Sequence, residues 1–292
     1  MTMRSDGLVV VDKAAGWTSH DVVAKLRGVL GTKKVGHSGT LDPDATGLLL
    51  VGVGSVTRLL RFLTALPKRY VGEVVLGVET TTLDASGEVT ATHDMDGVHI
   101  ESVRAAAATM TGDIMQVPPM VSAVQVGGRR LHDLARAGVE VEREPRAVTV
   151  HQFSVEPTQD SLVFSIDVTC SSGTYVRSLA ADLGHALGGG AHLRNLRRTE
   201  IGSFTIDAAL PIDKIDVDAL VDPATAVRDY ERVAVSPEIA ALVAHGKVLP
   251  VGTLTVHGEG PWALVDDAGA LLAMYESYEP GTVKPAVVIP RG

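Results

Sequence analysis

Residues 36–47 read Gly-His-Ser-Gly-Thr-Leu-Asp-Pro-Asp-Ala-Thr-Gly, and the apolar run Leu48-Leu49-Leu50-Val51 follows at once. The twelve residues hold two carboxylates, one histidine and three hydroxyls. A polar, turn-prone loop that leads into a buried strand can hold a reactive side chain rigidly at the mouth of a pocket. We therefore predict a functional loop followed by a buried strand.

The backbone of this loop restricts what it can do. Its glycines allow angles and close approaches that a β-carbon would block. Pro43 fixes its own φ and keeps Asp42 out of the helical region, so that Asp42 is presented by a stiffened backbone. The absence of Gly-Lys-Ser/Thr excludes a Walker phosphate loop. The simpler alternative is an Asx-turn, in which Asp42 and Asp44 bond to their own backbone.

Composition sets the outer limits of the prediction. A chain of 292 residues can bury a sizeable core, and its length favours two domains. Cys170 is the one cysteine, which excludes an internal disulfide framework and a thiolate-rich metal site and favours a reducing cytoplasm. The first apolar run, Leu8 to Val11, is too short for a signal peptide or a membrane span.

The charge of the chain is distributed unevenly. The net charge of -9 argues at first against a nucleic-acid partner. However, residues 1–70 hold ten Lys or Arg and five Asp or Glu, whereas residues 200–292 hold six and fourteen. A basic N-terminal part can follow phosphates while the acidic C-terminal part faces solvent. Chance scatter of surface charge is the alternative.

Local patterns predict a mixture of helices and strands. Thr18 and Asp21 form a capping signal ahead of apolar residues at helical spacing, and Gly31 ends that helix. We expect further helices over 101–110 and 174–187, and strands over 7–13, 70–78, 88–92, 120–126 and 162–170. From Val233 onward, short strands over 248–250, 252–256, 262–265 and 286–289 predict a small β-rich module.

Three further segments combine with the first loop. Lys68-Arg69-Tyr70 opens a strand, where a lone tyrosine is usually a core ring with its hydroxyl at the surface. Residues 172–178, Ser-Gly-Thr-Tyr-Val-Arg-Ser, lie at a strand-to-helix turn suited to anions, although Arg177 alone would be read as a surface helix arginine. Residues 190–199 hold three arginines, which suggest phosphate contact or a solvent-facing basic strand.

In this order, the four segments resemble the bacterial tRNA pseudouridine synthases of the TruB type. The resemblance covers residues 7–200 and implies an α+β fold, with a mixed, mainly antiparallel sheet flanked by helices. It implies a catalytic domain over 1–230, with an inserted RNA-binding lid at about 124–150, and a small PUA-like domain over 231–292.

The resemblance also implies roles for individual residues. Asp42 matches the catalytic aspartate, and Tyr70 matches the tyrosine that stacks on the target base. Arg177 matches the arginine that pairs with the catalytic aspartate, which would keep the carboxylate ionised. Tyr175 and Leu196 match residues that close the base pocket.

Two other parts of the predicted site face the RNA. His37 would fill the gap left by the flipped base or contact the phosphate beside it; a simple turn histidine is the alternative. The insertion holds Arg129 and Arg130 among mixed charges and glycines, as expected of a segment that closes on an RNA stem-loop. A solvated helix laced with ion pairs is the alternative for this insertion.

The function implied is an isomerase, an intramolecular transferase that converts uridine 55 in the T-loop of tRNA to pseudouridine. The target base must leave its stack. We expect no cofactor and no metal, the tRNA T-arm as partner, and a cytoplasmic monomer. Whether Asp42 is a nucleophile or removes a ribose proton stays open. The alternatives are a non-catalytic tRNA-binding or folding helper, and an unrelated α/β enzyme acting on a small phosphorylated substrate.

Overall fold

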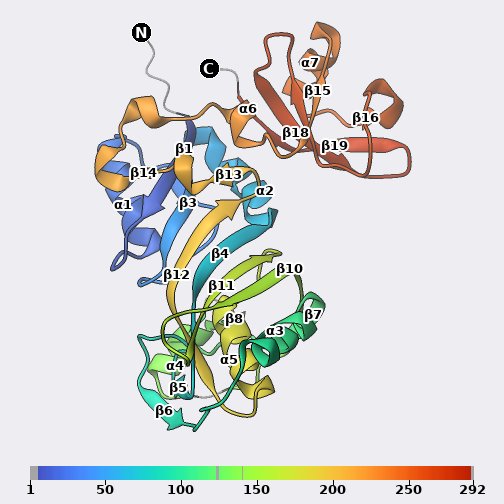
Figure 1. Ribbon diagram of the computed structural model, residues 1–292. Helices are drawn as coiled ribbons and strands as arrows, with labels where there is room; N and C mark the ends of the chain where they lie inside the picture. The colour runs from blue at the N-terminus through green and yellow to red at the C-terminus, as the bar shows by residue number, and fades with distance from the viewer. Residues whose placement is uncertain (1–5, 123–124, 140, 291–292) are drawn as a thin grey trace. The chain divides into compact units, whose positions relative to one another are not determined.

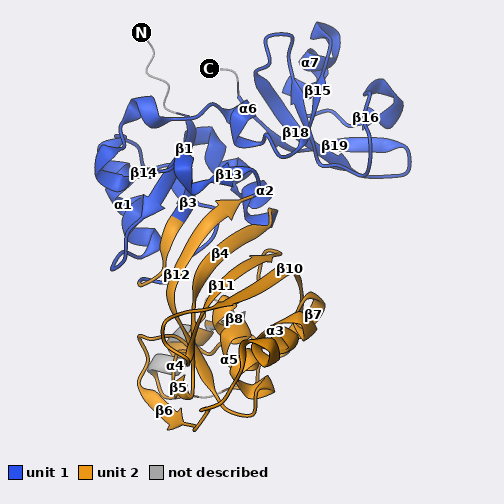
Figure 2. Ribbon diagram, viewed as in Figure 1, with its two compact units in different colours: residues 1–43, 48–65, 202–292 blue, residues 44–47, 66–201 orange. Residues whose placement is uncertain are grey.

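The computed structural model describes residues 6–122, 125–139 and 141–290. The chain forms two compact units (Figure 2). Unit 1 comprises residues 1–43, 48–65 and 202–292, and unit 2 comprises residues 44–47 and 66–201. The division expected after residue 230 stays a prediction. Within the described ranges, no helix is both long enough and apolar enough to span a membrane.

The N-terminal part of unit 1 holds one edge of a ten-stranded sheet, covered by a helix (Figure 1). Its strands lie in the order β14-β1-β3, with β1 parallel to β14 and β2 antiparallel to β3. Their bounds are Gly7–Lys13 for β1, Val35–His37 for β2, Thr46–Val53 for β3 and Leu210–Pro211 for β14. The expected strand over 7–13 and the buried strand after the loop are therefore confirmed.

Helix α1 (Ser19–Val29) follows its predicted signals. The hydroxyl of Thr18 accepts from the backbone N–H of Asp21 at 3.0 Å, and the carboxylate of Asp21 accepts from the N–H of Thr18 at 2.8 Å. The hydroxyl of Thr18 also donates to the carboxylate of Asp21 at 2.6 Å, and this bond, together with the one from the N–H of Thr18, lowers the pKa of Asp21. The apolar face of α1 joins the core beside these strands, which contains Val9, Val11, Val22, Val23, Leu26, Val35, Leu49, Val51, Val53 and Ile215.

Short elements complete this part of unit 1. They are η1 (Gly54–Leu59), α2 (Leu60–Ala65), β13 (Phe204–Thr205), η2 (Ile206–Ala208), η3 (Ile212–Lys214), η4 (Val217–Ala219) and α6 (Pro223–Ala226).

The C-terminal part of unit 1 is a five-stranded sheet in the order β15-β17-β18-β19-β16. It has a core of its own, built around Trp262 and Tyr275. Its elements are β15 (Glu231–Ala234), α7 (Pro237–Ala244), β16 (Leu249–Pro250), η5 (Val251–Thr253), β17 (Trp262–Val265), β18 (Leu271–Ser277) and β19 (Thr282–Val288). The strand expected over 252–256 is wrong, because η5 occupies its start.

Unit 2 is built on the antiparallel strands β12-β4-β11-β10-β7, with α5 packed on β12 and α3 on β10 (Figure 1). The strands are β4 (Lys68–Leu76), β7 (Gly112–Gln116), β10 (Arg146–Pro157), β11 (Val163–Cys170) and β12 (Ala191–Ile201). The helices are α3 (Ile100–Thr109), α4 (Leu131–Arg136) and α5 (Val176–Ala186). Helices expected over 101–110 and 174–187 are confirmed within a residue or two.

Two strand predictions in unit 2 need correction. The strand expected over 70–78 breaks at Gly77, whose φ is +83°. The separate hairpin of β5 (Val78–Thr80) and β6 (Val89–Thr92) follows. The strand expected over 120–126 is reduced to β8 (Gln125–Val126), which pairs with β9 (Arg129–Arg130). Residues 117–122 are irregular, and residues 123–124 lie outside the described part of the chain.

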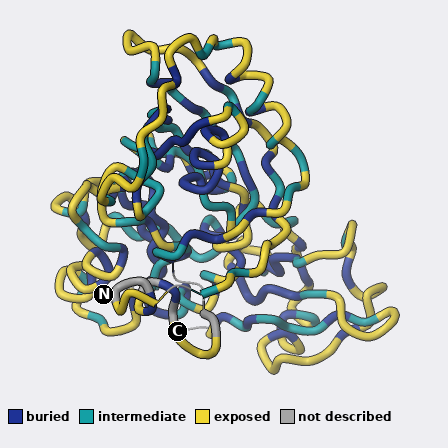
Figure 3. Tube along the Cα trace, turned by 90° about the horizontal axis from the view of Figure 1, so that it is seen from below, coloured by how far each residue is buried: buried dark blue, intermediate teal, exposed yellow. Residues whose placement is uncertain are grey.

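Gly47, the last residue of the opening loop, meets strand β12 in unit 2. Its φ is +101°, and a Cβ there would lie 2.2 Å from the carbonyl oxygen of Arg198. The parallel pairing of Gly47 with Arg198 leaves no room for a side chain. Arg198 is itself only 1% exposed. Figure 3 shows buried segments in the interior of the trace and exposed residues mainly at its outer turns. Glycine is therefore required for both its angle and its size.

Substituting Gly47→Ala should lower the free energy of unfolding by about 2 kcal/mol or more, because a clash adds to backbone strain. Gly112 is a matched control: its φ is +100°, but no atom lies within 4 Å of an added Cβ. Gly112→Ala should therefore cost only the strain, ~1 kcal/mol. Chemical denaturation of both variants measures the difference, and equal losses would contradict the close approach at Gly47.

Candidate active site

The opening loop is tied to the sheet of unit 1 at its start. His37 pairs with Val51 across the β2–β3 ladder, and the N–H of Ser38 donates to the carbonyl of Leu50 at 3.0 Å. Ser38 is fully buried. The loop therefore leaves the sheet from a fixed point.

Lys13 fixes the middle of the loop from within the same unit. It is only 1% exposed, and its Nζ donates to the carbonyl of Pro43 at 3.0 Å. The same ammonium donates to the carbonyls of Ala14 and Trp17, at 3.1 and 2.6 Å. The carbonyl of Pro43 also accepts from the N–H of Gly16, at 3.0 Å. Bonds to a charged donor in a buried place are strong, so the residue after Asp42 is held firmly.

Leu41 fixes the residue before Asp42. Its side chain is buried, and its N–H donates to the hydroxyl of Ser19 at 2.9 Å. The hydroxyl of Ser19 in turn approaches the carbonyl of Leu41 at 3.4 Å. Asp42 is partly exposed between these two anchored neighbours. The prediction that Asp42 is presented by a rigid backbone is therefore confirmed in unit 1.

His37 also has a defined setting in unit 1. Its ring meets that of His20 edge to face, with centroids 5.3 Å apart. The N–H of Gly39 lies 3.3 Å from its Nδ1, which makes Nδ1 an acceptor and places the ring proton of the neutral form on Nε2. His37 is partly exposed. A donor N–H at the loop surface suits the predicted contact with RNA, which stays a prediction.

In unit 2, Tyr70 lies on β4 between β11 and β12. It pairs with Val168 on one side and Arg198 on the other, and it is 9% exposed.

Lys68, two residues before Tyr70 on the same face of β4, is also buried, and burial lowers the pKa of its ammonium to about 8. Burial likewise raises the pKa of the Cys170 thiol to about 11, so Cys170 is an inert thiol at neutral pH.

Arg69 points to the opposite face of β4 and plays another part. Its guanidinium bonds both oxygens of Asp167 on β11, at 2.9 and 2.6 Å, and Glu200 on β12, at 2.8 Å. The side chain of Arg69 therefore links β4 to its two neighbours, β11 and β12. Because neighbouring strand residues face opposite ways, the Lys68-Arg69-Tyr70 motif sends Arg69 away from Tyr70.

Leu196 lies in an irregularity of β12. The pairing register with β4 shifts between Arg194 and Arg197, and Asn195 has a φ of +54°. Opposite this bulge is Gly72, where an added Cβ would lie 3.5 Å from the Cα of Leu196. Bulges re-aim a side chain and are common beside active sites. Asn195, a residue type that tolerates the left-handed conformation it adopts here, is the one local sign of this bulge.

Tyr175 is the residue that precedes helix α5. Its backbone N–H donates to the Oε1 of Gln116 at 2.7 Å, and its carbonyl accepts from the Nε2 of the same side chain at 3.0 Å. Gln116 is 2% exposed, whereas Tyr175 is partly exposed. No local pattern in the sequence marks Gln116, because its partner Tyr175 is 59 positions further along the chain.

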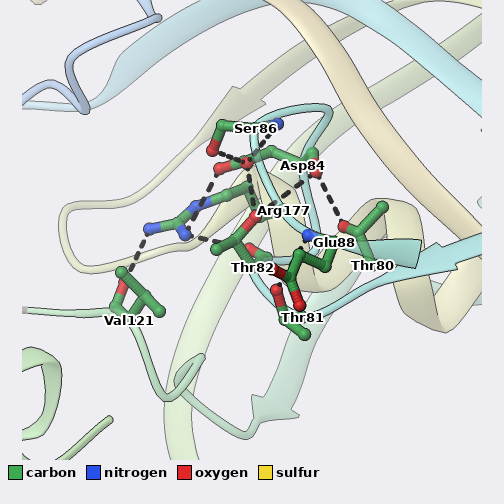
Figure 4. Close-up of polar contacts among 8 residues, drawn as sticks. All are labelled: Thr80, Thr81, Thr82, Asp84, Ser86, Glu88, Val121 and Arg177. Atoms are coloured by element: carbon green, nitrogen blue, oxygen red, sulfur yellow. Dashed lines mark hydrogen bonds and ion pairs between the residues drawn. The ribbon is translucent and has the colours of Figure 1, made fainter. Parts of the chain in front are cut away.

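Arg177 is buried in the first turn of α5, so the reading of this residue as a surface arginine is wrong. Figure 4 shows its guanidinium bonded to two backbone carbonyls, those of Thr82 at 3.0 Å and Val121 at 2.9 Å. The carboxylate of Asp84 lies 3.4 Å away. A buried arginine needs such partners to offset the loss of hydration.

Asp84 organises the turn between β5 and β6. One oxygen of its carboxylate accepts from the hydroxyls of Thr82 at 2.6 Å and Ser86 at 2.5 Å, while its other oxygen faces Arg177 (Figure 4). The next residue, Ala85, donates its N–H to the carbonyl of Leu193 on β12 at 2.9 Å. Asp84, part of the expected hairpin turn, therefore also serves as a partner of Arg177. The sequence did not indicate this pairing.

The arginines of β12 are less available than the sequence suggested. Arg198 is buried, and Arg194 bonds Glu73 on β4 at 2.6 Å. The expectation that the three arginines of 190–199 contact phosphates is therefore wrong for Arg198, because its side chain is buried.

The insertion is only partly helical. Helix α4 covers six residues, and its Leu131 and Leu134 are buried. Two apolar side chains of this helix are therefore buried, and the ion pairs expected in the alternative of a solvated helix stay a prediction. The side chain of Arg129 is exposed on β9, whereas the side chain of Arg130 lies outside the described part of the structure.

The predicted residues are divided between the two units. His37 and Asp42 belong to unit 1, and Tyr70, Tyr175, Arg177 and Leu196 belong to unit 2. The pairing of Arg177 with Asp42 therefore stays a prediction. The side chains that the structure describes include no group of three or more His, Cys, Asp or Glu arranged to hold a metal ion.

Comparison with known proteins supplies two family matches. Residues 27–176 match the TruB family pseudouridylate synthase N-terminal domain, and residues 177–233 match the tRNA pseudouridylate synthase B C-terminal domain. The chain is 46% identical to tRNA pseudouridine synthase B of Thermobifida fusca, over 97% of this chain and 98% of the relative. It is also 46% identical to the same-named protein of Rhodococcus jostii, over 92% and 90%.

A solved structure shares the fold. A chain in a crystal structure of a Cbf5-Nop10-Gar1 complex superposes with a TM-score of 0.74 at 26% identity, covering 98% of this chain and 84% of that one. The α+β fold with a mixed sheet and a C-terminal sheet is thereby confirmed.

Proposed function

Because the chain belongs to the TruB family of pseudouridylate synthases, we propose that it isomerises uridine 55 in the T-loop of tRNA, with Asp42 as its catalytic residue. The general activity, without the target position, follows from the family and from the relatives that match nearly the whole chain: the protein is an isomerase that forms pseudouridine in tRNA. The target position, the T-arm as binding element and the residue roles belong to the proposal.

The reaction rearranges bonds without adding or removing atoms overall. The bond between C1′ and N1 of uridine breaks, the uracil turns, and C1′ joins C5. The proton from C5 is lost and a proton is gained at N1. A carboxylate serves such a reaction either as a nucleophile or as the base that removes a ribose proton. Both roles need an ionised oxygen at a fixed place beside the flipped nucleotide.

The anchored loop is the observation that carries the assignment of Asp42. Leu41 is held by Ser19, and Pro43 is held by Lys13 and Gly16. A group that is fixed before the substrate arrives spends no free energy on becoming ordered during the reaction. Asp44, two residues on, is exposed. The loop therefore distinguishes one carboxylate from the other.

Four residues of unit 2 have the chemistry of a base pocket. Tyr70 offers an aromatic face for stacking on uracil and a hydroxyl that can take part in removal of the C5 proton. Leu196, aimed by the bulge of β12, and Tyr175, before α5, supply apolar surface. Arg177 is proposed to pair with Asp42 and to keep its carboxylate ionised. His37 is proposed to contact the RNA beside the flipped base.

The exposed Arg129 of the insertion is proposed to contact phosphates, together with Arg130. We further propose that residues 231–292 form the PUA-like domain of a cytoplasmic monomer. Support for the domain comes from its separate sheet and core.

Release of tritium from tRNA labelled at C5 of uridine tests the proposed function. Incubation of the purified chain with an unmodified transcript should release one tritium per tRNA. A transcript with cytidine at position 55 should release none. Release from both transcripts would overturn the proposed target, and release from neither would favour a tRNA-binding or folding helper without activity.

Replacing Arg129 and Arg130 by glutamine should weaken tRNA binding and flatten its salt dependence. Each lost phosphate contact should lower the slope of log K against log salt by about 0.7 to 0.9. Arg104→Gln removes one positive charge from an arginine whose guanidinium already bonds the carbonyl of Val155 and the carboxylate of Glu156, and should leave the slope unchanged. Binding titrations at several salt concentrations measure the slopes, and an unchanged slope in the double variant would remove the insertion from the RNA contact.

A further inference from the structure

Gln116 ends strand β7 and makes a two-point contact with the backbone of Tyr175. Its Oε1 accepts the N–H of Tyr175 at 2.7 Å, and its Nε2 donates to the carbonyl of Tyr175 at 3.0 Å. Only one orientation of the amide satisfies both bonds, so the donor and the acceptor are assigned without ambiguity. At 2% exposure, water cannot replace either bond.

The same short segment holds the first turn of α5 at two further points. The hydroxyl of Ser178 donates to the carbonyl of Val117 at 3.0 Å, and the guanidinium of Arg177 donates to the carbonyl of Val121 at 2.9 Å. Tyr175 occupies the N-cap position of α5, yet no side chain caps the helix there. Contacts from residues 116–121 therefore fix the start of α5, where a capping side chain would ordinarily do so.

We propose that Gln116 is a positioning residue for pseudouridine formation, acting through Tyr175 and the first turn of α5. The inference rests on the proposed function, which places Tyr175 and Arg177 in the base pocket. The two bonds hold the N–H and the carbonyl of Tyr175, on either side of its Cα, and so fix the direction in which its ring leaves the backbone. They also fix the start of the helix turn that carries Arg177. Small errors in the position of such groups cost far more in rate than in binding.

The first test replaces Gln116 by methionine, which has a similar length but no amide. The single-turnover rate of Gln116→Met should fall by about 10-fold to 100-fold, while the dissociation constant for tRNA stays within about 2-fold. Gln152 on the neighbouring strand β10 is the matched control, because it is exposed and its amide bonds the hydroxyl of Ser154. Gln152→Met should keep the wild-type rate. A wild-type rate in Gln116→Met would overturn the proposal.

The second test separates positioning from general destabilisation. A neutral carboxyl offers one donor and one acceptor, as the amide does, whereas an ionised carboxyl offers acceptors only. The rate of Gln116→Glu relative to wild type should therefore rise as the pH falls from about 9 to about 6, since burial raises the pKa of the introduced carboxyl. If the rate of Gln116→Glu relative to wild type does not rise as the pH falls, the proposal is overturned, and this holds even where Gln116→Met fails to fold.

A double-mutant cycle tests whether Gln116 acts through Tyr175. In a Tyr175→Leu background, Gln116→Met should cost much less in rate than in the wild-type background. Equal costs in both backgrounds would overturn the coupling. The wild-type protein is assayed in parallel. If the wild type releases no tritium, the proposed function is contradicted. If the wild type and Gln116→Met are both fully active, only the role of Gln116 is contradicted.

Discussion

Asp42→Asn is expected to abolish pseudouridine formation and to leave tRNA binding intact. Asparagine has the same shape as aspartate, so the loop held by Ser19 and Lys13 should keep its conformation. It lacks the negative oxygen that either attacks the substrate or removes a proton. We expect the single-turnover rate to fall by at least ~10⁴-fold, the loss typical of a group that does the chemistry itself.

Asp44→Asn is the matched control for this change. Asp44 lies two residues away in the same loop, carries the same charge and is exposed. Its replacement changes the net charge equally and should leave the rate near that of the wild type. Appreciable turnover by Asp42→Asn would contradict the catalytic role of Asp42. An equal loss in both variants would show that the loop contributes charge rather than a catalytic group.

Tyr70→Phe should slow the reaction by at least ~100-fold while the protein still binds tRNA, as expected for loss of a group that moves a proton. The phenyl ring keeps the stacking surface, and the side chain is 9% exposed within a strand paired on both sides. The folded structure should therefore change little. Stopped reactions with labelled tRNA measure the rate, and filter binding measures the affinity.

Tyr230 provides the control for loss of a tyrosine hydroxyl. Its hydroxyl donates to the carbonyl of Phe62 at 2.8 Å, within unit 1. Tyr230→Phe should lower stability by about 1 kcal/mol and leave the rate unchanged. If Tyr70→Phe reacts as fast as the wild type, Tyr70 acts only as a stacking surface.

Local signals predicted the elements that depend on neighbours in sequence. The capping pair Thr18 and Asp21 gave the start of α1, and the apolar run after Gly47 gave a buried strand. Helix α7 carries a signal of the same kind, since Ser236 caps it and Pro237 is its first residue. Strand β18 was missed although Leu271 to Tyr275 is mainly apolar, because a run buried on both faces shows no alternation.

Contacts between distant residues could not be predicted in the same way. Lys13 looked like the polar end of a strand, but its ammonium holds Pro43, thirty positions along the chain. Arg177 was expected beside an aspartate, yet nothing in the sequence indicated Asp84 as a partner. Such pairs depend on which strands become neighbours, and a single sequence shows that only through resemblance to a family.

The central claim is that this chain converts uridine 55 of tRNA to pseudouridine through Asp42. The most direct measurement is pseudouridine sequencing of tRNA from a strain that lacks the gene, complemented either with the wild-type chain or with Asp42→Asn. We predict that position 55 carries unmodified uridine in the deletion strain, pseudouridine with the wild-type chain, and uridine again with Asp42→Asn. Pseudouridine at position 55 in the deletion strain, or its restoration by Asp42→Asn, would contradict the account.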